Sequence, residues 1–233
     1  MAEALEDTRT TEAEVDEEQD FSGEITKMIR RWKNEKYAPE ILPFDQDTIE
    51  FFVNLLQFVT ENLEEEGEDE KGAVDTATNL RWIEKERFTY ILRDYLRIRL
   101  RKLSQFPVYY LDKDNQALLS SAERIWLHEY WDNKSQLLQN RFLGALPGHL
   151  QSLTNDDNAP MDMVRRPSIQ KHVYARICGD LGQLTPSPTP GSAVPSGTQQ
   201  PLELVEGETY LVQYSVLRKF LIEPDHDGKV ELI

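Results

Sequence analysis

Residues able to do chemistry are few and widely spaced in this 233-residue chain. The four histidines, His128, His149, His172 and His226, lie far apart in sequence, and we interpret each as a surface or helix-end residue. The sequence contains no glycine-rich phosphate loop, no Gly-x-Ser-x-Gly nucleophile elbow and no His-Glu-x-x-His metal helix. Because catalysis needs convergent groups, we expect a non-catalytic protein with no cofactor or metal site.

Two acidic stretches have the composition of cation sites. Residues 225–228 read Asp-His-Asp-Gly, but polar residues before a glycine are also what a turn between strands requires. Residues 61–70 hold seven acids, which could attract cations or a basic partner. A solvated loop explains this run more simply. We therefore predict a turn and a loop at these places.

Positive charge is most concentrated between residues 87 and 102. This stretch contains Arg87, Arg93, Arg97, Arg99, Arg101 and Lys102. Arg93, Arg97 and Arg101 are four residues apart and would share one face of a helix. DNA binding would also call for interleaved exposed aromatic residues and a basic domain, and neither condition is clearly met. We favour ion pairs with neighbouring helices or a partner subunit, and a helical DNA-binding protein remains the alternative.

The net charge of −16 is unevenly placed, since residues 1–20 hold nine acids against the single base Arg9. A strongly acidic chain repels phosphate at long range and is a poor candidate for autonomous nucleic-acid binding. The lone Cys178 fits a reducing intracellular compartment. With no signal peptide and no apolar run of about 20 residues, we expect a soluble protein.

Helical periodicity dominates the first 150 residues. It predicts four long helices, over residues 21–37, 47–63, 75–106 and 120–146. Asp47 with Glu50, and Ser120 with Glu123, have capping-box spacing at two of the starts. In the second helix, Phe51, Leu55 and Phe58 form an apolar stripe beside the main one, which predicts two packing partners.

After residue 150 the apolar pattern alternates, which favours strands. We predict strands at residues 172–177, 202–205, 209–214 and 229–233. The expected organisation is therefore α+β and mainly α. Residues 1–20 form a disordered acidic tail, 21–150 a helical bundle-like domain, 151–169 a linker and 170–233 a small β domain. Residues 179–201 contain five prolines and are expected to form a disordered insertion in the β domain.

Two stretches are more specific than generic helical packing. Residues 32–42 read Trp-Lys-Asn-Glu-Lys-Tyr-Ala-Pro-Glu-Ile-Leu, and residues 86–100 read Glu-Arg-Phe-Thr-Tyr-Ile-Leu-Arg-Asp-Tyr-Leu-Arg-Ile-Arg-Leu. Together they resemble the fourth-subunit (SLD-five type) family of the eukaryotic GINS DNA replication complex. The resemblance covers most of residues 21–233, including the order of a helical domain before a small β domain.

The resemblance implies a scaffold subunit in a heterotetramer with three other GINS subunits. That complex joins the MCM ring and a further activator to form the nuclear CMG helicase, which serves initiation and elongation of DNA replication and meets other replisome proteins. ATP hydrolysis would belong to the ring, and any DNA contact of this chain would be weak or indirect. We expect subunit contacts through Trp32, Asn34, Glu35, Tyr37, Pro39, Phe51, Leu55, Phe58, Arg87, Tyr90, Tyr95, Arg97, Arg99 and Leu100.

Overall fold

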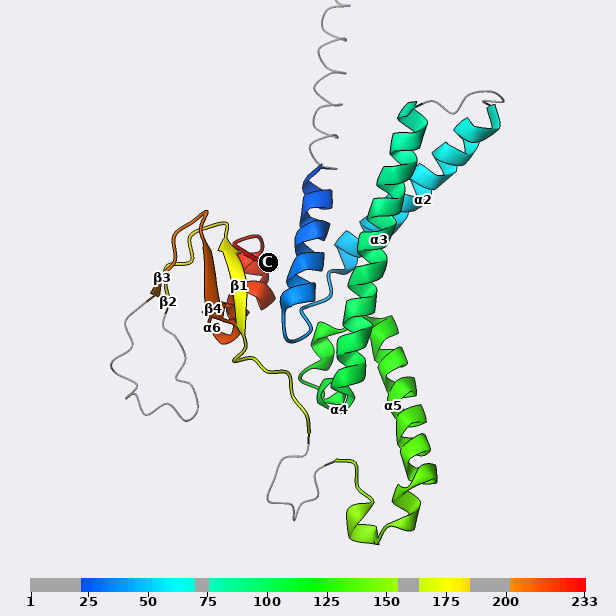
Figure 1. The fold of residues 1–233 in the computed structure, drawn as a ribbon, viewed down its shortest axis with the longest axis vertical. Helices are drawn as coiled ribbons and strands as arrows, with labels where there is room; N and C mark the ends of the chain where they lie inside the picture. The colour runs from blue at the N-terminus through cyan, green and yellow to red at the C-terminus, as the bar shows by residue number, and fades with distance from the viewer. Residues whose placement is uncertain (1–21, 70–75, 155–163, 185–201) are drawn as a thin grey trace, which may run out of the picture. The chain divides into compact units, whose positions relative to one another are not determined.

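A computed structural model describes residues 22–69, 76–154, 164–184 and 202–233. The chain is mainly helical, with a small antiparallel sheet towards its C-terminal end, as the sequence predicted (Figure 1). The chain divides into two compact units. The first contains the residues up to Lys33 together with Asp45–Tyr95, and the second contains Asn34–Phe44 together with Leu96–Ile233.

The helices account for most of the described chain. Residues 22–37 are helical. The further α-helices are α2 (Gln46–Asp69), α3 (Thr76–Gln105), α4 (Pro107–Leu111), α5 (Ser121–Arg141) and α6 (Tyr214–Ile222). Short 3-10 turns are η1 (Gln116–Leu118), η2 (Leu143–Ala145), η3 (Gly148–Leu150) and η4 (Pro224–His226). None of these described helices combines the length and apolarity needed to cross a lipid bilayer.

The first unit packs large apolar side chains between its helices. Met28, Phe52 and Leu63 are buried, and the Phe52 and Phe88 rings meet edge to face with centroids 5.8 Å apart. Trp32 donates its Nε1 hydrogen to Asp94 Oδ2 at 2.8 Å. The core face of α2 therefore includes Ile49, Phe52 and Leu63.

The ends of α2 differ from the prediction. Asp45, and not Asp47, caps the helix, because Asp45 Oδ1 accepts from the Thr48 N–H at 3.2 Å and Oδ2 accepts from Thr48 Oγ1 at 2.9 Å. The helix also continues to Asp69, so the loop predicted from residue 61 is wrong over this part. Glutamate is a good helix former, and buried Leu63 holds this stretch against the unit.

The second unit contains a helical core that includes the C-terminal end of α3. Leu103, Tyr110, Leu119 and Leu127 pack there with Ile41. The predicted capping box of α5 is confirmed, since Ser120 Oγ accepts from the Glu123 N–H at 3.2 Å while Glu123 Oε2 accepts from the Ser120 N–H at 2.9 Å. The helix ends at Arg141, five residues earlier than predicted, and 3-10 turns follow.

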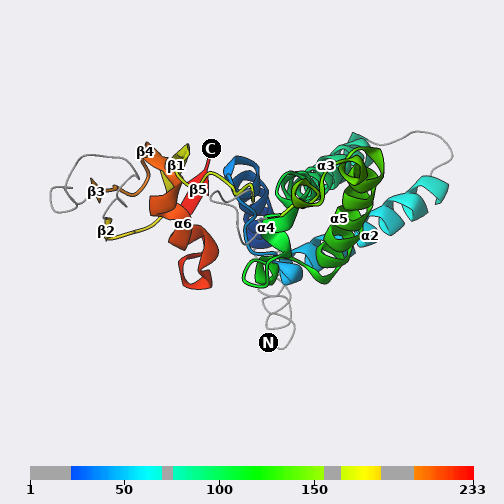
Figure 2. The ribbon, with the colours of Figure 1, turned by 90° about the horizontal axis from the view of Figure 1, so that it is seen from below.

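The sheet has strand order β4-β1-β5, with β1 (His172–Ile177) antiparallel to both β4 (Thr209–Gln213) and β5 (Val230–Leu232). Figures 1 and 2 show α6 beside this sheet. Alternate β1 residues Val173, Ala175 and Ile177 are buried in one core with the apolar face of α6. The prediction missed α6, because its apolar residues directly continue those of β4.

Two-residue strands β2 (Gln183–Leu184) and β3 (Leu202–Glu203) pair beside this core. Leu181 and Leu184 are buried in it, so packed structure extends into the start of the predicted proline-rich insertion. Residues 185–201 of that insertion and the predicted tail at residues 1–20 lie outside the described residues.

Candidate functional site

Residues 34–44 connect the helices and the sheet of the second unit through buried side chains. The six charged groups involved, which we call the ionic hub, are Glu35, Glu40, Arg99, Lys102, Glu123 and Arg218. Three carboxylates therefore face three cations. Their charges balance, which is the condition under which burial of ions is tolerated.

Arg99 is the centre of the hub and is fully buried. Its Nε and Nη2 donate to the two carboxylate oxygens of Glu123 at 2.6 and 3.0 Å. Its Nη1 donates to Glu35 Oε2 at 3.1 Å and to the Leu42 carbonyl at 2.7 Å, and Nη2 also reaches the Leu118 carbonyl at 3.1 Å. All five N–H donors of the guanidinium are thus used, which a lysine at this position could not reproduce.

Lys102 lies one helical turn further along α3 and also has its three donors occupied. Its Nζ donates to the carbonyls of Glu35 and Glu40 and, at 2.7 Å, to Glu35 Oε1. Burial lowers the pKa of Lys102, while the Glu35 carboxylate opposes this shift. Glu35 and Lys102 consequently fix residues 34–44 against α3.

Two more residues, both on α6, hold the same segment. Glu40 accepts a bidentate pair from Arg218, at 2.6 Å from Nε and 3.0 Å from Nη2, and a third bond from Tyr214 Oη at 3.0 Å. Burial, followed by the neighbouring Glu40 charge, raises the pKa of Tyr214 above its usual value, so the phenol remains a donor.

Asn34 closes the outer edge of β5. Its Nδ2 donates to the Val230 carbonyl at 3.3 Å, and its Oδ1 accepts from the Leu232 N–H at 2.7 Å. One side-chain amide therefore supplies the two backbone bonds that an additional strand would supply, which protects this edge from other pairing.

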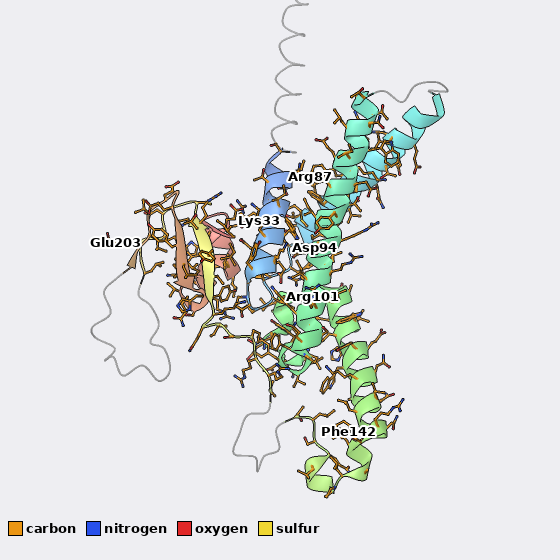
Figure 3. All side chains as sticks on the ribbon, in the orientation of Figure 1. Lys33, Arg87, Asp94, Arg101, Phe142 and Glu203 are labelled. Carbon is orange, nitrogen blue, oxygen red and sulfur yellow. The ribbon has the colours of Figure 1, made fainter. Side chains whose placement is uncertain are left out.

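The first unit presents a different kind of surface on α3. Leu80, Ile83, Arg87 and Tyr90 follow one another at spacings of three and four and share one helix face, which we call the α3 stripe. Leu80, Ile83 and Tyr90 are 58%, 64% and 58% exposed, and Arg87 is exposed with them. Figure 3 labels Arg87 and, further along α3, Asp94 and Arg101.

The predicted interface residues fall into three groups. Those buried inside the chain are Asn34, Glu35, Tyr95 and Arg99. Those half-buried are Trp32, Pro39, Phe51, Leu55 and Leu100. Those exposed are Tyr37, Phe58, Arg87, Tyr90 and Arg97. Burial leaves the first group no access to another protein in this conformation, so the interface prediction now rests on the other two groups.

The hub residues that the prediction omitted had recognisable signals. Glu40 lies within the 32–42 stretch, Lys102 lies three residues after Arg99, and Glu123 was already assigned a capping role. Arg93, Arg97 and Arg101 are exposed and make no ion pair with any described residue of the chain. The ion pairs that we predicted between these three arginines and neighbouring helices are therefore not formed with any described carboxylate of the chain.

No group of three or more His, Cys, Asp or Glu residues suited to a metal ion occurs among the residues that the structure describes. Comparison with known proteins is more informative. The family model described as "Sld5: GINS complex protein helical bundle domain" matches residues 56–142. A relative from Mus musculus, "DNA replication complex GINS protein SLD5", is 30% identical over 162 residues, which are 66% of this chain and 67% of the relative.

The chain belongs to the Sld5 family of GINS complex proteins. Proteins of the same name from Chaetomium globosum and Debaryomyces hansenii are 29% and 27% identical over 222 and 211 residues. These alignments cover 90% and 84% of this chain, and 90% and 82% of the relatives. The Sld5 family match includes the α3 stripe and the Arg99 to Glu123 part of the hub, so family membership and the suggested resemblance agree.

Proposed function

We propose that this chain is a non-catalytic scaffold subunit of a GINS heterotetramer in the nucleus. In this role it binds three sister subunits and helps to hold the MCM ring and its activator in the CMG helicase at the replication fork. Membership of the Sld5 family supports a part in a DNA replication complex. The scaffold role rests on the physical character of α3.

The observation that carries the proposal is the exposed α3 stripe. Three large apolar side chains on one helix face each expose more than half of their surface to water, and clusters of exposed apolar residues mark binding sites. Spacings of three and four residues are those by which one helix packs along another. A helix of a sister subunit is therefore the expected occupant.

The second stripe of α2 adds to the proposed contact surface in the same unit. Phe51 and Leu55 are half-buried, and Phe58 on the same face is 61% exposed. Arg87 lies over the Phe88 ring at 6.0 Å and is placed to set the orientation of a partner helix. The proposed subunit contacts are Trp32, Phe51, Leu55, Phe58, Arg87 and Tyr90.

The hub contributes rigidity to the proposed scaffold. A contact surface is useful to an assembly when the parts behind it do not rearrange, and fully paired buried ions allow few alternative arrangements. Glu35, Glu40 and Arg99 thereby fix residues 34–44, α6 and α3 within the second unit.

Light scattering coupled to size-exclusion chromatography tests the proposal. The full chain is measured alone and after co-expression with three GINS-type subunits. We expect a defined complex with one copy of each subunit, and aggregation of the chain alone because the α3 stripe is uncovered. A well-behaved monomer that does not associate with those subunits would refute the scaffold role.

Arg93, Arg97 and Arg101, which pair with no described carboxylate, support DNA binding as the second candidate function. Arginines four residues apart along a helix are about 6 Å apart in rise, which suits a row of phosphates. The net charge of −16 opposes it. Affinity of the full chain for duplex DNA that falls steeply with salt, and falls further in an Arg97→Gln/Arg101→Gln variant, would favour this candidate.

A further inference from the structure

The second unit has a small pocket between the junction of α3 with α4 and the helix α5. Its volume is about 180 Å³. The apolar part of the wall consists mainly of Phe106, Pro107, Trp131 and Leu153. None of the groups assigned to the hub or to the α3 stripe lines it.

The polar part of the wall is cationic. Lys134 on α5 and Arg165 line the pocket, and none of its described lining residues is an aspartate or a glutamate. Lys134 Nζ lies 3.4 Å from the Tyr130 hydroxyl and 5.3 Å from that ring, and these are neutral partners. Neither cation is paired with a carboxylate of the described residues. Two positive groups beside an apolar wall therefore have no counter-charge among the residues that the structure describes.

The volume restricts what can bind. Pockets for cofactors and drug-sized molecules usually measure roughly 300–1,000 Å³, so this one is too small for them. It suits a single large side chain, as in interfaces where an aromatic or aliphatic anchor residue fills a pocket. Trp131 and Phe106 provide ring surfaces for such an anchor.

We propose that this pocket binds a short acidic peptide motif of a partner protein, in which an aromatic side chain enters the apolar part and an adjacent carboxylate pairs with Lys134 and Arg165. The carboxylate supplies a counter-charge that no described residue gives these two cations. A polyanion such as nucleic acid fits less well, because the net charge of −16 repels it at long range while a single carboxylate responds mainly to the two nearby cations. The site is separate from the proposed sister-subunit contacts.

The test uses N-acetyl-4-fluorophenylalanine, which carries both an aromatic ring and a carboxylate, and its amide, which lacks the charge. The full chain is purified together with the sister subunits that bind to it. Each compound is then titrated into this sample, and binding is measured by fluorine NMR line broadening. We expect saturable binding of the acid with a Kd on the order of 1 mM, as is usual for a fragment of this size. The amide should bind at least about fivefold more weakly, because it lacks the ion pairs.

Charge variants place the binding in this pocket. Lys134→Met combined with Arg165→Gln should reduce binding of the acid to the level of the amide. Lys113→Met combined with Arg124→Gln removes two exposed cations that do not line the pocket, and should leave both titrations unchanged.

Three results would overturn the pocket assignment: no saturable binding of the acid, equal binding of acid and amide, or full binding by the Lys134/Arg165 variant. The acid and amide comparison needs no substitution, so it remains decisive if that variant does not fold. Recovery of sister subunits is recorded separately, so a failure of the scaffold proposal is distinguished from a failure of the pocket.

Discussion

The two halves of α3 contain opposite exceptions to the usual burial of apolar residues and exposure of charged ones. In the first unit the helix leaves Leu80, Ile83 and Tyr90 exposed, whereas in the second unit it buries Arg99 and Lys102. The difference is explained by the partners that the chain itself provides. Carboxylates from residues 34–44 and from α5 surround the cations, while the described residues of the first unit leave the apolar stripe uncovered. Whether a side chain of α3 is buried therefore depends on the partners that the fold places beside it, and not on the local composition of the helix alone.

The two halves should also respond differently to substitution. A buried ion whose partner is removed is left uncompensated in a low-dielectric interior, which costs several kcal/mol. An exposed apolar side chain gives up little folding free energy when it is changed, but it loses binding free energy if a partner covers it. The hub should therefore affect stability, and the stripe should affect assembly.

The largest effect is expected at Glu35. A Glu35→Ala substitution removes one of the two carboxylates bonded to Arg99, which keeps Glu123, and the one carboxylate among the described residues that is bonded to Lys102. The free energy of unfolding should fall by about 3–5 kcal/mol. Urea unfolding of the full chain measures this loss.

The control for Glu35 is a more exposed ion pair. Lys27 lies 3.4 Å from Asp45, with 28% of its side chain exposed, and Lys27→Ala should cost less than about 1 kcal/mol. Equal losses of unfolding free energy in Glu35→Ala and Lys27→Ala would show that burial of the hub ions has no energetic consequence. That result would contradict the difference proposed between the two halves of α3.

An intermediate effect is expected at Asn34. Asn34→Ala removes both side-chain bonds to β5 and should lower stability by about 1–3 kcal/mol. Hydrogen exchange at the Leu232 amide should become faster, because that N–H loses its acceptor. Asn34→Asp keeps this acceptor but places a carboxylate against the Val230 carbonyl. It should therefore protect Leu232 without restoring full stability, and unchanged exchange in Asn34→Ala would exclude the edge-closing role.

The smallest effect is expected at the cap of α2 and depends on pH. Burial alone raises the pKa of Asp45, but the Thr48 bonds and the charges of Lys27 and Arg31 together lower it below the usual value of 3.8. A carboxyl whose folded-state pKa is lowered stabilises the fold above its unfolded pKa. This contribution is lost as pH falls through the folded-state value.

Asp45→Ala should therefore cost about 1 kcal/mol at pH 7, and the difference from the unsubstituted chain should narrow below about pH 4. Unfolding curves recorded from pH 7 to pH 3 measure this. Asp47→Ala, which changes an exposed acid that does not cap the helix, should show a smaller loss. A larger loss of stability in Asp47→Ala than in Asp45→Ala would contradict the assignment of Asp45 as the N-cap and favour Asp47, as the sequence predicted.

The sequence predicted the helical order, the α+β class and several boundaries because these depend on local signals. Strand β1 was predicted at its observed bounds, and α3 within one residue at each end. Ser120 and Glu123 marked α5 through a capping box that forms as expected. Helix α6 was missed, since the run from Tyr210 to Leu221 contains no glycine or proline to separate a strand from a helix.

The candidate site was less predictable than the fold. The stretches 32–42 and 86–100 suggested Asn34, Glu35 and Arg99 as subunit contacts, but sequence could not show that these residues are buried within the chain or that Glu35 contacts Arg99. Glu35 and Arg99 are 64 residues apart, and Glu40 meets Arg218 across 178 residues. Contacts at such separations depend on the folded chain path, so the sequence could favour ion pairs for the arginines of residues 87–102 without identifying Glu35 and Glu123 as the partners of Arg99.

The most direct test of the scaffold role compares two isoleucines of nearly equal exposure. Ile83 in the α3 stripe is 64% exposed and Ile125 on α5 is 62% exposed, so glutamate at either position should cost similar and small folding free energy. Each variant is co-expressed with the sister subunits, and their recovery is quantified. Ile83→Glu should weaken assembly by at least about 2 kcal/mol, roughly thirtyfold, while Ile125→Glu should recover the subunits normally. Undiminished recovery by Ile83→Glu, or an equal loss in both variants, would contradict the account.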